Sequence, residues 1–532
     1  MQNKRNYIYC FCLSLTMVIL ANVWPNQINA KEKVLVIGQA GDIAVIDNQQ
    51  SVGPAKNALI QIYDWQWMSW APKASVSGAL VSSQKFDPGV IWAWETTEKG
   101  GKTFQRFHVR PGQVHHSGNP ITAHDFKYAL QRRAAFKRDY LHRFLGSMYK
   151  SEFLDEKIKI VDDYTMDVEV KRAMPLYFDL WAQRVYFDSK LMLKNATDDD
   201  PWSKKFAAKN DAGAGPYKIE KWSPGVEMVL NRFDKYWGPR PPMDKIIFKV
   251  IPDLSSRVLL LKRGEIDVAL NLARRETNSL RNDPNIKIVS APSTNILFIG
   301  MNFDQEPFGN KDLRYALSYA FPYDDIIPSL YQGEAQPLNG PIPTTVPGAL
   351  TKRHYTTDLE KAKKHLDKSG LGNGLELTLT YEVGYPQHKQ IGILFAENLK
   401  KIGVNLKLQQ LPVGQFETGI RKNSLAFFVR ESLAWIRTPE YGLLINYQSE
   451  SSANPTGYSN KSVDPKINEA MLELDAAKRA RLTDAAQEII VEDAPWIWVA
   501  QPNFQLAMRK NIIGYIPQNT ELHHFWLVDK VE

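Results

Sequence analysis

The chain has 532 residues, of which 44% are hydrophobic and 23% are charged, and its formal net charge at pH 7 is +8. A chain of this length is expected to form two or more domains. Its basic residues are dispersed, with no run of five lysines or arginines, and because nucleic-acid binding requires a concentrated basic surface, we expect no nucleic-acid partner.

The first 30 residues have the pattern of a cleaved secretory signal. Lys4 and Arg5 precede an apolar run, and the small residues near Ala30 suit a signal peptidase that cleaves before Lys31. The alternative is an uncleaved membrane anchor, but the run is short of the roughly 20 apolar residues that span a bilayer comfortably. We therefore expect a mature protein that is exported to the periplasm.

The two cysteines of the chain, Cys10 and Cys12, both lie inside this apolar run. Neither stands directly after it, where a lipid-accepting cysteine would have to be. The mature chain then contains no cysteine, which excludes disulfides, thiolate nucleophiles and cysteine-based metal sites together. No second apolar stretch approaches membrane length, so the mature chain is expected to be soluble.

The remainder of the chain alternates between helical and strand patterns. Residues Thr122–Asp125 predict a capping box that starts an amphipathic helix, and a second amphipathic helix is expected after Asn310. Further on, Leu375–Tyr381 alternates like a strand, Gln387–Ile402 has apolar residues at helical spacing, and residues 404–411 alternate again. This order predicts a βαβ unit, which places the chain in the α/β class.

The sequence lacks the common catalytic and nucleotide-binding motifs. It contains no G-x-S-x-G, H-E-x-x-H, P-loop or dinucleotide-binding glycine pattern. The adjacent pairs His115/His116 and His523/His524 offer at most one metal ligand each, because neighbouring side chains on extended backbone point to opposite faces. The sequence therefore predicts no metal, no cofactor and no enzyme, with a secreted hydrolase as the alternative class.

Aromatic residues are abundant, with 14 tryptophans in the chain. Several cluster, as in the stretch YDWQWMSW that contains Trp65, Trp67 and Trp70. Most are expected to pack in the core. Indole and phenol rings also combine a wide contact surface with a hydrogen-bonding edge, which suits a cleft that encloses a ligand.

The stretch AGAGPYKIEKWSPGVEMVLNRFDKYWG, residues Ala212–Gly238, resembles the signature of the family 5 extracellular solute-binding proteins, the dipeptide- and oligopeptide-binding type that serves ABC importers. Further blocks follow the order of that family. They include FHVRPGQVHHSGNPITAHDFKYAL before the signature and SSRVLLLKRGEIDVAL and GMNFDQEPFGNKDLRYALSYA after it. The resemblance extends over most of Lys31–Glu532.

The resemblance implies a two-lobed α/β periplasmic-binding-protein fold in which the chain crosses between the lobes twice and forms a hinge. After the signal peptide, residues 1–30, lobe one would comprise residues 31–290 and 500–532, with an inserted subdomain at about 55–211. Lobe two would comprise residues 291–499. Such a protein closes on its ligand by rotation about the hinge.

The implied function is capture of a small solute, with a dipeptide or oligopeptide preferred, and its delivery to the membrane subunits of an ABC permease. No covalent chemistry is required, and a monomer is expected. The same architecture resembles carriers of oligosaccharides, opine-like conjugates and metal or haem complexes, so these ligands remain as alternatives. A small molecule that binds the closed form better than the open form is sufficient for this function.

Four parts of the sequence are expected to contact the ligand. In lobe one they are the loop after the first strand and the aromatic residues that follow it. In lobe two it is the tryptophan loop after the apolar run LAFFV, and the last part is a pair of residues beside the second crossing. The predicted ligand-binding residues are Ser51, Val52, Gly53, Tyr63, Trp65, Trp67, Arg430, Trp435, Arg437, Thr438, Glu440, Trp498 and Gln501.

The tryptophan loop departs from the family at one position. In peptide-carrying relatives it resembles W-x-x-D, and the aspartate binds the α-amino group of the peptide, whereas Thr438 stands here. A hydroxyl cannot neutralise a buried ammonium. Either Glu440 substitutes, or the ligand has no free amine, in which case Arg430 or Arg437 would pair with an acidic ligand and Trp435 would stack on it. A plain surface loop is the third alternative.

Overall fold

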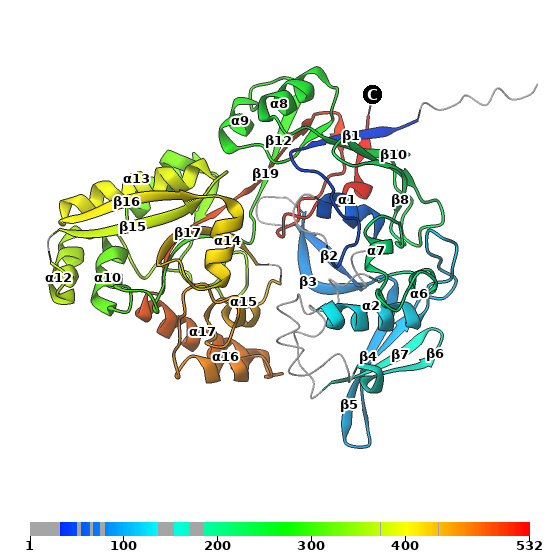
Figure 1. The fold of residues 1–532 in the computed structure, drawn as a ribbon, viewed down its shortest axis with the longest axis horizontal. Helices are drawn as coiled ribbons and strands as arrows, with labels where there is room; N and C mark the ends of the chain where they lie inside the picture. Colours follow the sequence, from blue (N-terminus) through cyan, green and yellow to red (C-terminus); the bar gives the residue numbers. More distant parts are fainter. Residues whose placement is uncertain are drawn as a thin grey trace, which may run out of the picture. The chain divides into compact units, whose positions relative to one another are not determined.

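Two large β-sheets, of seven and six strands, organise the chain in this computed structural model (Figure 1). The structure describes residues 32–50, 55–63, 68–74, 80–136, 154–170, 186–372, 374–434 and 436–531. Residues Lys33–Glu532 form one compact unit. None of the helices in the described ranges combines the length and the apolar character that a membrane crossing requires.

The seven-stranded sheet has the strand order β12-β19-β11-β1-β10-β9-β8. Strand β1 is parallel to both of its neighbours, β10 and β11, and the remaining pairs are antiparallel. The strands are β1 (Val34–Gln39), β8 (Tyr217–Ser223), β9 (Glu227–Arg232), β10 (Lys245–Val250), β11 (Val268–Ala269), β12 (Ile286–Ala291) and β19 (Phe504–Arg509). The associated helices are α1 (Ala55–Ile62), α8 (Leu254–Arg263) and α9 (Arg274–Ser279).

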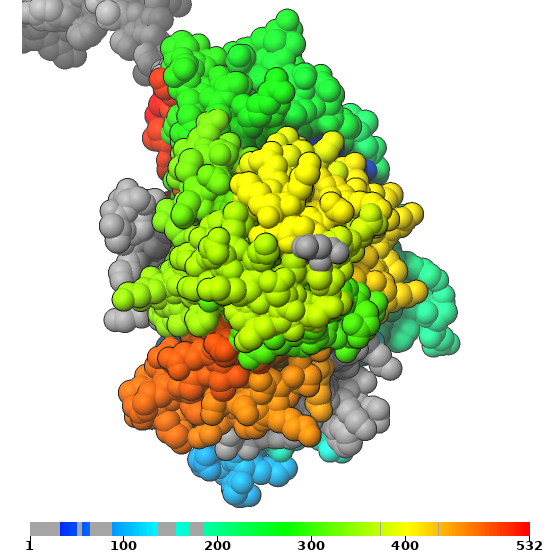
Figure 2. Space-filling view, turned by 90° about the vertical axis from the view of Figure 1, so that its left-hand side faces the viewer, coloured from blue at the N-terminus to red at the C-terminus, as the bar shows by residue number. Residues whose placement is uncertain are grey.

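The six-stranded sheet has the order β14-β18-β13-β17-β15-β16. Its strands are β13 (Asn295–Met301), β14 (Ala335–Pro337), β15 (Leu375–Glu382), β16 (Val404–Leu411), β17 (Phe427–Leu433) and β18 (Trp496–Pro502). Its helices are α10 (Lys311–Ala320), α11 (Tyr323–Ile326), the π-helix η2 (Ile327–Tyr331), α12 (Leu359–Ser369), α13 (Pro386–Lys401), α14 (Val413–Arg421), α15 (Pro439–Tyr447), α16 (Asp464–Ala470) and α17 (Ala476–Asp493). In Figure 2 the orange helices α16 and α17 lie beneath the yellow-green and yellow segments of this part of the chain.

Smaller sheets complete the fold. A four-stranded sheet has the order β4-β5-β7-β6, and β2-β3 and β20-β21 form two-stranded sheets. The strands are β2 (Met68–Ala74), β3 (Leu80–Pro88), β4 (Ile91–Lys99), β5 (Lys102–Val109), β6 (Ile158–Asp162), β7 (Thr165–Val170), β20 (Ile512–Ile513) and β21 (Asp529–Lys530). The helices are α2 (Ala123–Phe136), α4 (Leu154–Lys157), α6 (Ser189–Lys194), α7 (Lys204–Ala207) and the 3-10 helix η3 (Phe525–Leu527).

The elements expected from local patterns are present. Asn310 caps α10 through its side chain, which accepts a hydrogen bond from the backbone of Leu313 at 3.2 Å, and Asp125 accepts one from the backbone N–H of Thr122 at 2.7 Å at the start of α2. The predicted βαβ unit is β15, α13 and β16, with the two strands parallel. Helix α13 packs on both strands, and the α/β class is confirmed.

Two short connections join the large sheets. Residues 292–294 lead from β12 to β13, and Asn503 leads from β18 to β19. Strands β12 and β19 pair with each other in the first sheet, and β13 and β18 pair in the second. The chain therefore passes between the sheets twice at one place, which we call the crossover. The division into lobes at residues 290/291 and 499/500 stays a prediction.

Candidate functional site

The candidate site lies at the carboxyl ends of the parallel strands β15, β16 and β17. In open α/β sheets, ligands bind outside this edge because the loops there can surround a small molecule. Thr380 of β15 is in register with Phe428 of β17, so the ends of both strands reach the same edge. Glu382, Arg430 and Glu431 stand there, and the tryptophan loop follows β17 directly.

Glu431 is held by donors from two neighbouring elements. Its Oε2 accepts a hydrogen bond from Nδ2 of Asn295 at 2.7 Å, and its Oε1 accepts one from Nε2 of Gln387 at 3.2 Å. Burial acts to raise the pKa of Glu431, but His388, Asn295 and Gln387 outweigh it and keep the pKa below its ordinary value. Glu431 therefore stays ionised in a poorly hydrated place, with a side chain 16% exposed.

A second carboxylate reaches this region from the carboxyl-terminal segment. Oε1 of Glu521 accepts a hydrogen bond from Oγ of Ser293 in the crossover at 2.6 Å. Burial raises the pKa of Glu521 to about 7, Ser293 opposes that rise, and the negative charge of Glu431 adds to it. The two carboxylates thus repel each other, and both residues retain intermediate exposure, so a solute can reach them.

The crossover connects these two carboxylates through hydrogen bonds. Oγ of Ser293, which donates to Glu521, accepts from the backbone N–H of Asn295 at 2.9 Å, and Asn295 donates to Glu431. Thr294 donates its backbone N–H to the carbonyl of Asn519 at 2.9 Å and its hydroxyl to the carbonyl of Ala434 at 2.8 Å. The carboxyl-terminal segment, the crossover and the tryptophan loop are therefore one connected structure.

Other charges at this edge are partly compensated. Nη2 of Arg430 lies 3.2 Å from Oε1 of Glu417 in α14. Burial and the charge of Glu417 raise the pKa of Glu382, while Arg430 lowers it. His388 stacks on Tyr385 with ring centroids 4.7 Å apart. The edge as a whole holds more carboxylates than cations.

Two predicted residues of the tryptophan loop have structural partners. Oγ1 of Thr438 accepts a hydrogen bond from the backbone of Tyr441 at 3.4 Å and so caps α15. Oε1 of Glu440 lies 3.0 Å from Nε of Arg479 in α17, and Glu440 is 8% exposed. The negative charge of Glu440 is therefore already neutralised inside the protein. A role of either residue in ligand binding stays a prediction.

The remaining predicted residues of this half of the chain are also held by protein groups. Arg437 donates from Nη2 to the carbonyl of Thr345 at 3.1 Å, and burial lowers the pKa of Arg437. Trp498 donates to the hydroxyl of Tyr447 at 3.1 Å. Gln501 accepts from the backbone of Thr344 at 2.7 Å. Gln501 also donates to the carbonyl of Ser293 in the crossover. Ligand contacts of Arg430, Arg437, Trp498 and Gln501 stay predictions.

Of the residues predicted in lobe one, the structure describes Tyr63. Its ring is fully buried and meets Phe187 edge to face with ring centroids 5.3 Å apart. The other predicted residues of this half, and the tryptophan of the loop after β17, lie outside the described residues. They are Ser51, Val52, Gly53, Trp65, Trp67 and Trp435.

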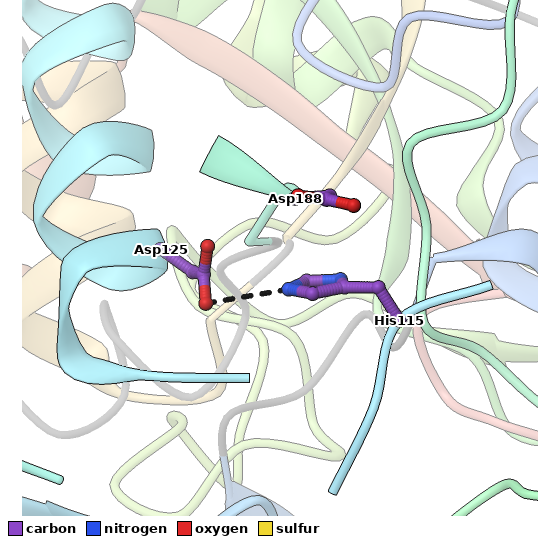
Figure 3. A group of neighbouring side chains, drawn as sticks. All are labelled: His115, Asp125 and Asp188. Carbon is purple, nitrogen blue, oxygen red and sulfur yellow. Dashed lines mark ion pairs between the residues drawn. The ribbon is translucent and has the colours of Figure 1, made fainter. Parts of the chain in front are cut away.

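A separate buried cluster contains His115, Asp125 and Asp188, whose ligand-type atoms lie within 4.8 Å of one another (Figure 3). Nε2 of His115 is 3.3 Å from Oδ2 of Asp125. Each carboxylate already accepts four hydrogen bonds from the protein, which fill its acceptor positions. Asp125 accepts from Ser189 at 2.6 and 2.9 Å and from Thr122 at 2.7 and 3.3 Å. Asp188 accepts from Asn119 at 2.9 and 3.0 Å, from the backbone of Leu191 at 2.9 Å and from Ser117. A cation would have to displace these donors, so we assign the cluster a structural role in joining α2 to α6.

The adjacent His116 has a different partner. Its Nδ1 is 2.9 Å from a carboxylate oxygen of Asp211, and its Nε2 is 2.9 Å from the carbonyl of Gly215. The two neighbouring histidines thus serve two different sites, as the opposite orientation of successive side chains requires.

Comparisons with known proteins agree with this architecture. The family model for bacterial extracellular solute-binding proteins, family 5 Middle, matches residues 78–454. The chain is 26% identical over 524 residues to the probable D,D-dipeptide-binding periplasmic protein DdpA of Escherichia coli (strain K12), covering 94% of this chain and 95% of that one. It is 25% identical over 434 residues to the glutathione-binding protein GsiB of Pectobacterium atrosepticum, covering 80% and 82%.

A solved structure has the same fold. It is the ABC transporter-associated periplasmic binding protein DppA from Helicobacter pylori in complex with the peptide STSA, with a TM-score of 0.77 and 22% identity, covering 94% of this chain and 98% of that one.

Proposed function

The chain belongs to the bacterial extracellular solute-binding proteins of family 5, and we propose that its ligand is a short peptide with a free amino group. It has the two-lobed periplasmic-binding-protein fold and serves as the substrate-binding protein of an ABC importer. The family and the relatives are binding proteins and not enzymes. The solute is thus captured, carried and released without chemical change.

One observation supports a peptide with a free amino group as the ligand. Glu431, an ionised and poorly hydrated carboxylate, stands at the strand edge where α/β proteins bind ligands. A desolvated anion is stabilised by a cation that it can hydrogen-bond. Two relatives are named for a D,D-dipeptide and for glutathione, and both compounds combine amide groups with an amino group. A neutral oligosaccharide would leave His388, at 3.6 Å, as the only ion-pair partner of Glu431 in the described part of the chain.

Capture follows from the position of the site beside the crossover. Strands β12 and β13, and strands β18 and β19, are each separated by at most three residues, so a change of backbone angles there rotates one sheet against the other. A ligand closes such a protein when it gains more contacts in the closed form than in the open form. The closed complex is then the form that the permease accepts.

Calorimetry and thermal unfolding with a matched ligand panel test the proposal. The panel contains a free dipeptide and tripeptide, their amino-acetylated forms, an oligosaccharide and an opine. The free peptides should bind and raise the melting temperature, because a ligand at one hundred times its Kd stabilises the folded state by about 2.7 kcal/mol. Equal binding of the acetylated forms, or binding of only the sugar or the opine, contradicts the proposal.

We also propose that the mature protein begins at Lys31 and acts as a monomer. The relatives named as periplasmic support the periplasm as its location, and the basic start, apolar run and small residues before Lys31 support cleavage there. Amino-terminal sequencing of the protein from its native envelope should start at or near Lys31. Retention of Met1 in the membrane fraction would contradict cleavage, and a dimer by light scattering would contradict the monomer.

A further inference from the structure

We propose that Glu431 and Glu521, which Ser293 and Asn295 connect through hydrogen bonds, together bind the primary ammonium group of the ligand. This inference rests on the proposed peptide ligand and names the residues that select it. Neither residue was among those predicted from the sequence. The site would replace the carboxylate that the tryptophan loop lacks at Thr438.

The hydrogen bonds of this region leave acceptors in excess. Glu521 receives one hydrogen bond, from Ser293, and Glu431 receives one at each of its oxygens. No lysine or arginine of the described part of the chain lies within ion-pair distance of either carboxylate, and His388 is the partner of Glu431. A carboxylate offers about four acceptor positions, and an ammonium offers three donors. A ligand ammonium therefore fits what these two groups lack.

His388, which lies beside Glu431, also indicates that a ligand group belongs here. Its side chain is 2% exposed, and its Nε2 lies 3.6 Å from Oε1 of Glu431, beyond hydrogen-bond distance. Neither of its ring nitrogens has a hydrogen-bond partner among the described residues. The hydroxyl of Tyr331, which is 1% exposed, is also without a partner there. Buried polar groups without partners are rare in folded proteins unless a ligand or water completes them.

Other carboxylates near this edge are less suited to the same role. Glu440 is paired with Arg479 at 3.0 Å, and Glu417 is paired with Arg430 at 3.2 Å. An ammonium bound to either one would have to compete with an arginine that is already in place. Neither Glu431 nor Glu521 has a lysine or arginine within ion-pair distance in the described part of the chain; His388 lies 3.6 Å from Glu431, and the charge of Arg274 acts on Glu521 without an ion pair. A ligand cation near both carboxylates would relieve their mutual repulsion.

The position of the pair links recognition of the amine to closure. Ser293, which hydrogen-bonds Glu521, belongs to the connection from β12 to β13, and Asn295, which hydrogen-bonds Glu431, is the first residue of β13. A cation that draws Glu431 and Glu521 together therefore acts on the segment where the chain passes between the sheets. The ligand then binds one arrangement of the crossover more tightly than the other. Such a difference in affinity is what a ligand needs in order to drive closure.

Acid should weaken binding of the amine. The groups that influence Glu521 are Glu431, Ser293 and Arg274, with Tyr515 and Tyr385 also coupled to it. Because the pKa of Glu521 is about 7 without ligand, the proton must leave before the carboxylate can pair with an ammonium. Affinity for a free peptide should fall by up to about tenfold for each pH unit below 7.

Calorimetry on two variants, Glu431→Gln and Glu521→Gln, tests the inference with free and amino-acetylated alanyl-alanine. The matched control is Glu376→Gln, on the same strand β15 as Glu382, where Glu376 forms an exposed ion pair with Lys407. Each test variant should weaken binding of the free dipeptide at pH 8 by at least about tenfold, because a charge-assisted pairing is lost. Binding of the acetylated dipeptide should stay as in the wild type, and the control should change neither.

A measurement on the wild type needs no variant. The heat of binding the free dipeptide at pH 7 should depend on the ionisation enthalpy of the buffer, because Glu521 releases a proton, and this dependence should vanish in Glu521→Gln. If the wild type binds the free dipeptide and both variants bind it equally well, this inference is wrong and the peptide ligand stands. If the variants lose both dipeptides alike, the residues are structural and the inference is wrong. If the wild type binds no peptide, both proposals are wrong.

Discussion

The charge of Glu521 should make the ligand-free protein less stable at alkaline pH, and Glu521→Gln should remove this effect. Burial raises the pKa of Glu521 from 4.5 to about 7. Between these values the folded state holds a proton that the unfolded state has released. Below pH 4.5 the carboxyl is protonated in both states, and the folded state keeps its full stability. As the pH rises from 4.5 to 7, the unfolded state releases this proton more readily, so the free energy of unfolding falls.

The size of the effect follows from the shift in pKa. A difference between 4.5 and about 7 corresponds to roughly 3 kcal/mol of folding free energy, since one pKa unit is worth about 1.4 kcal/mol. The intermediate exposure of Glu521 lets solvent screen the charge, which makes this figure an upper bound. Glutamine has nearly the shape of the protonated acid and cannot ionise, and it can still accept the hydrogen bond from Ser293.

Urea unfolding without ligand, at pH 8.0 and at pH 5.0, measures the effect. Glu521→Gln should raise the free energy of unfolding at pH 8.0 by up to about 3 kcal/mol and by much less at pH 5.0. The control Glu376→Gln, in an exposed ion pair, should change it by less than about 1 kcal/mol at either pH. A stabilisation that is equal at both pH values, or a destabilisation at pH 8.0, would refute the reasoning about the buried charge.

Three further substitutions test buried contacts and buried charge elsewhere in the fold, each by urea unfolding. Asp47→Asn should lower the free energy of unfolding by about 3–5 kcal/mol, because it leaves the fully buried Arg132 without its counter-charge; a loss below 1 kcal/mol would contradict this. Gly215→Ala should destabilise, since the added Cβ would lie 2.5 Å from the carbonyl oxygen of Gln61; wild-type stability would contradict the close approach. Burial lowers the pKa of His524 from 6.5 to about 4, so on acidification the unfolded state takes up a proton before the folded state does. The free energy of unfolding therefore falls between pH 6.5 and pH 4, and His524→Gln should remove up to about 3 kcal/mol of that fall. An unchanged dependence of stability on pH would contradict this.

Elements whose signals are local could be predicted from the amino-acid sequence. Helix α13 runs from Pro386 to Lys401, close to the predicted 387–402. The prediction succeeds because the apolar residues of one helix face recur at a fixed spacing within a short segment. The cap at Asn310 and the strands on either side of α13 follow in the same way. The family blocks likewise gave the fold class and the solute-binding function. These features depend on short segments, so a linear pattern is enough to specify them.

Which carboxylates of the site lack an arginine or lysine partner depends on the tertiary structure. The sequence indicated that Thr438 leaves the tryptophan loop without a carboxylate, but it could not show that Glu440 pairs with Arg479. Glu431 carried one weak signal, a lone carboxylate near the end of a predicted apolar strand. Glu521 carried none, since its partner Ser293 lies 228 residues earlier in the chain. The burial and the ion-pair partners of these carboxylates depend on which distant segments come into contact when the chain folds. A local sequence pattern does not contain that information.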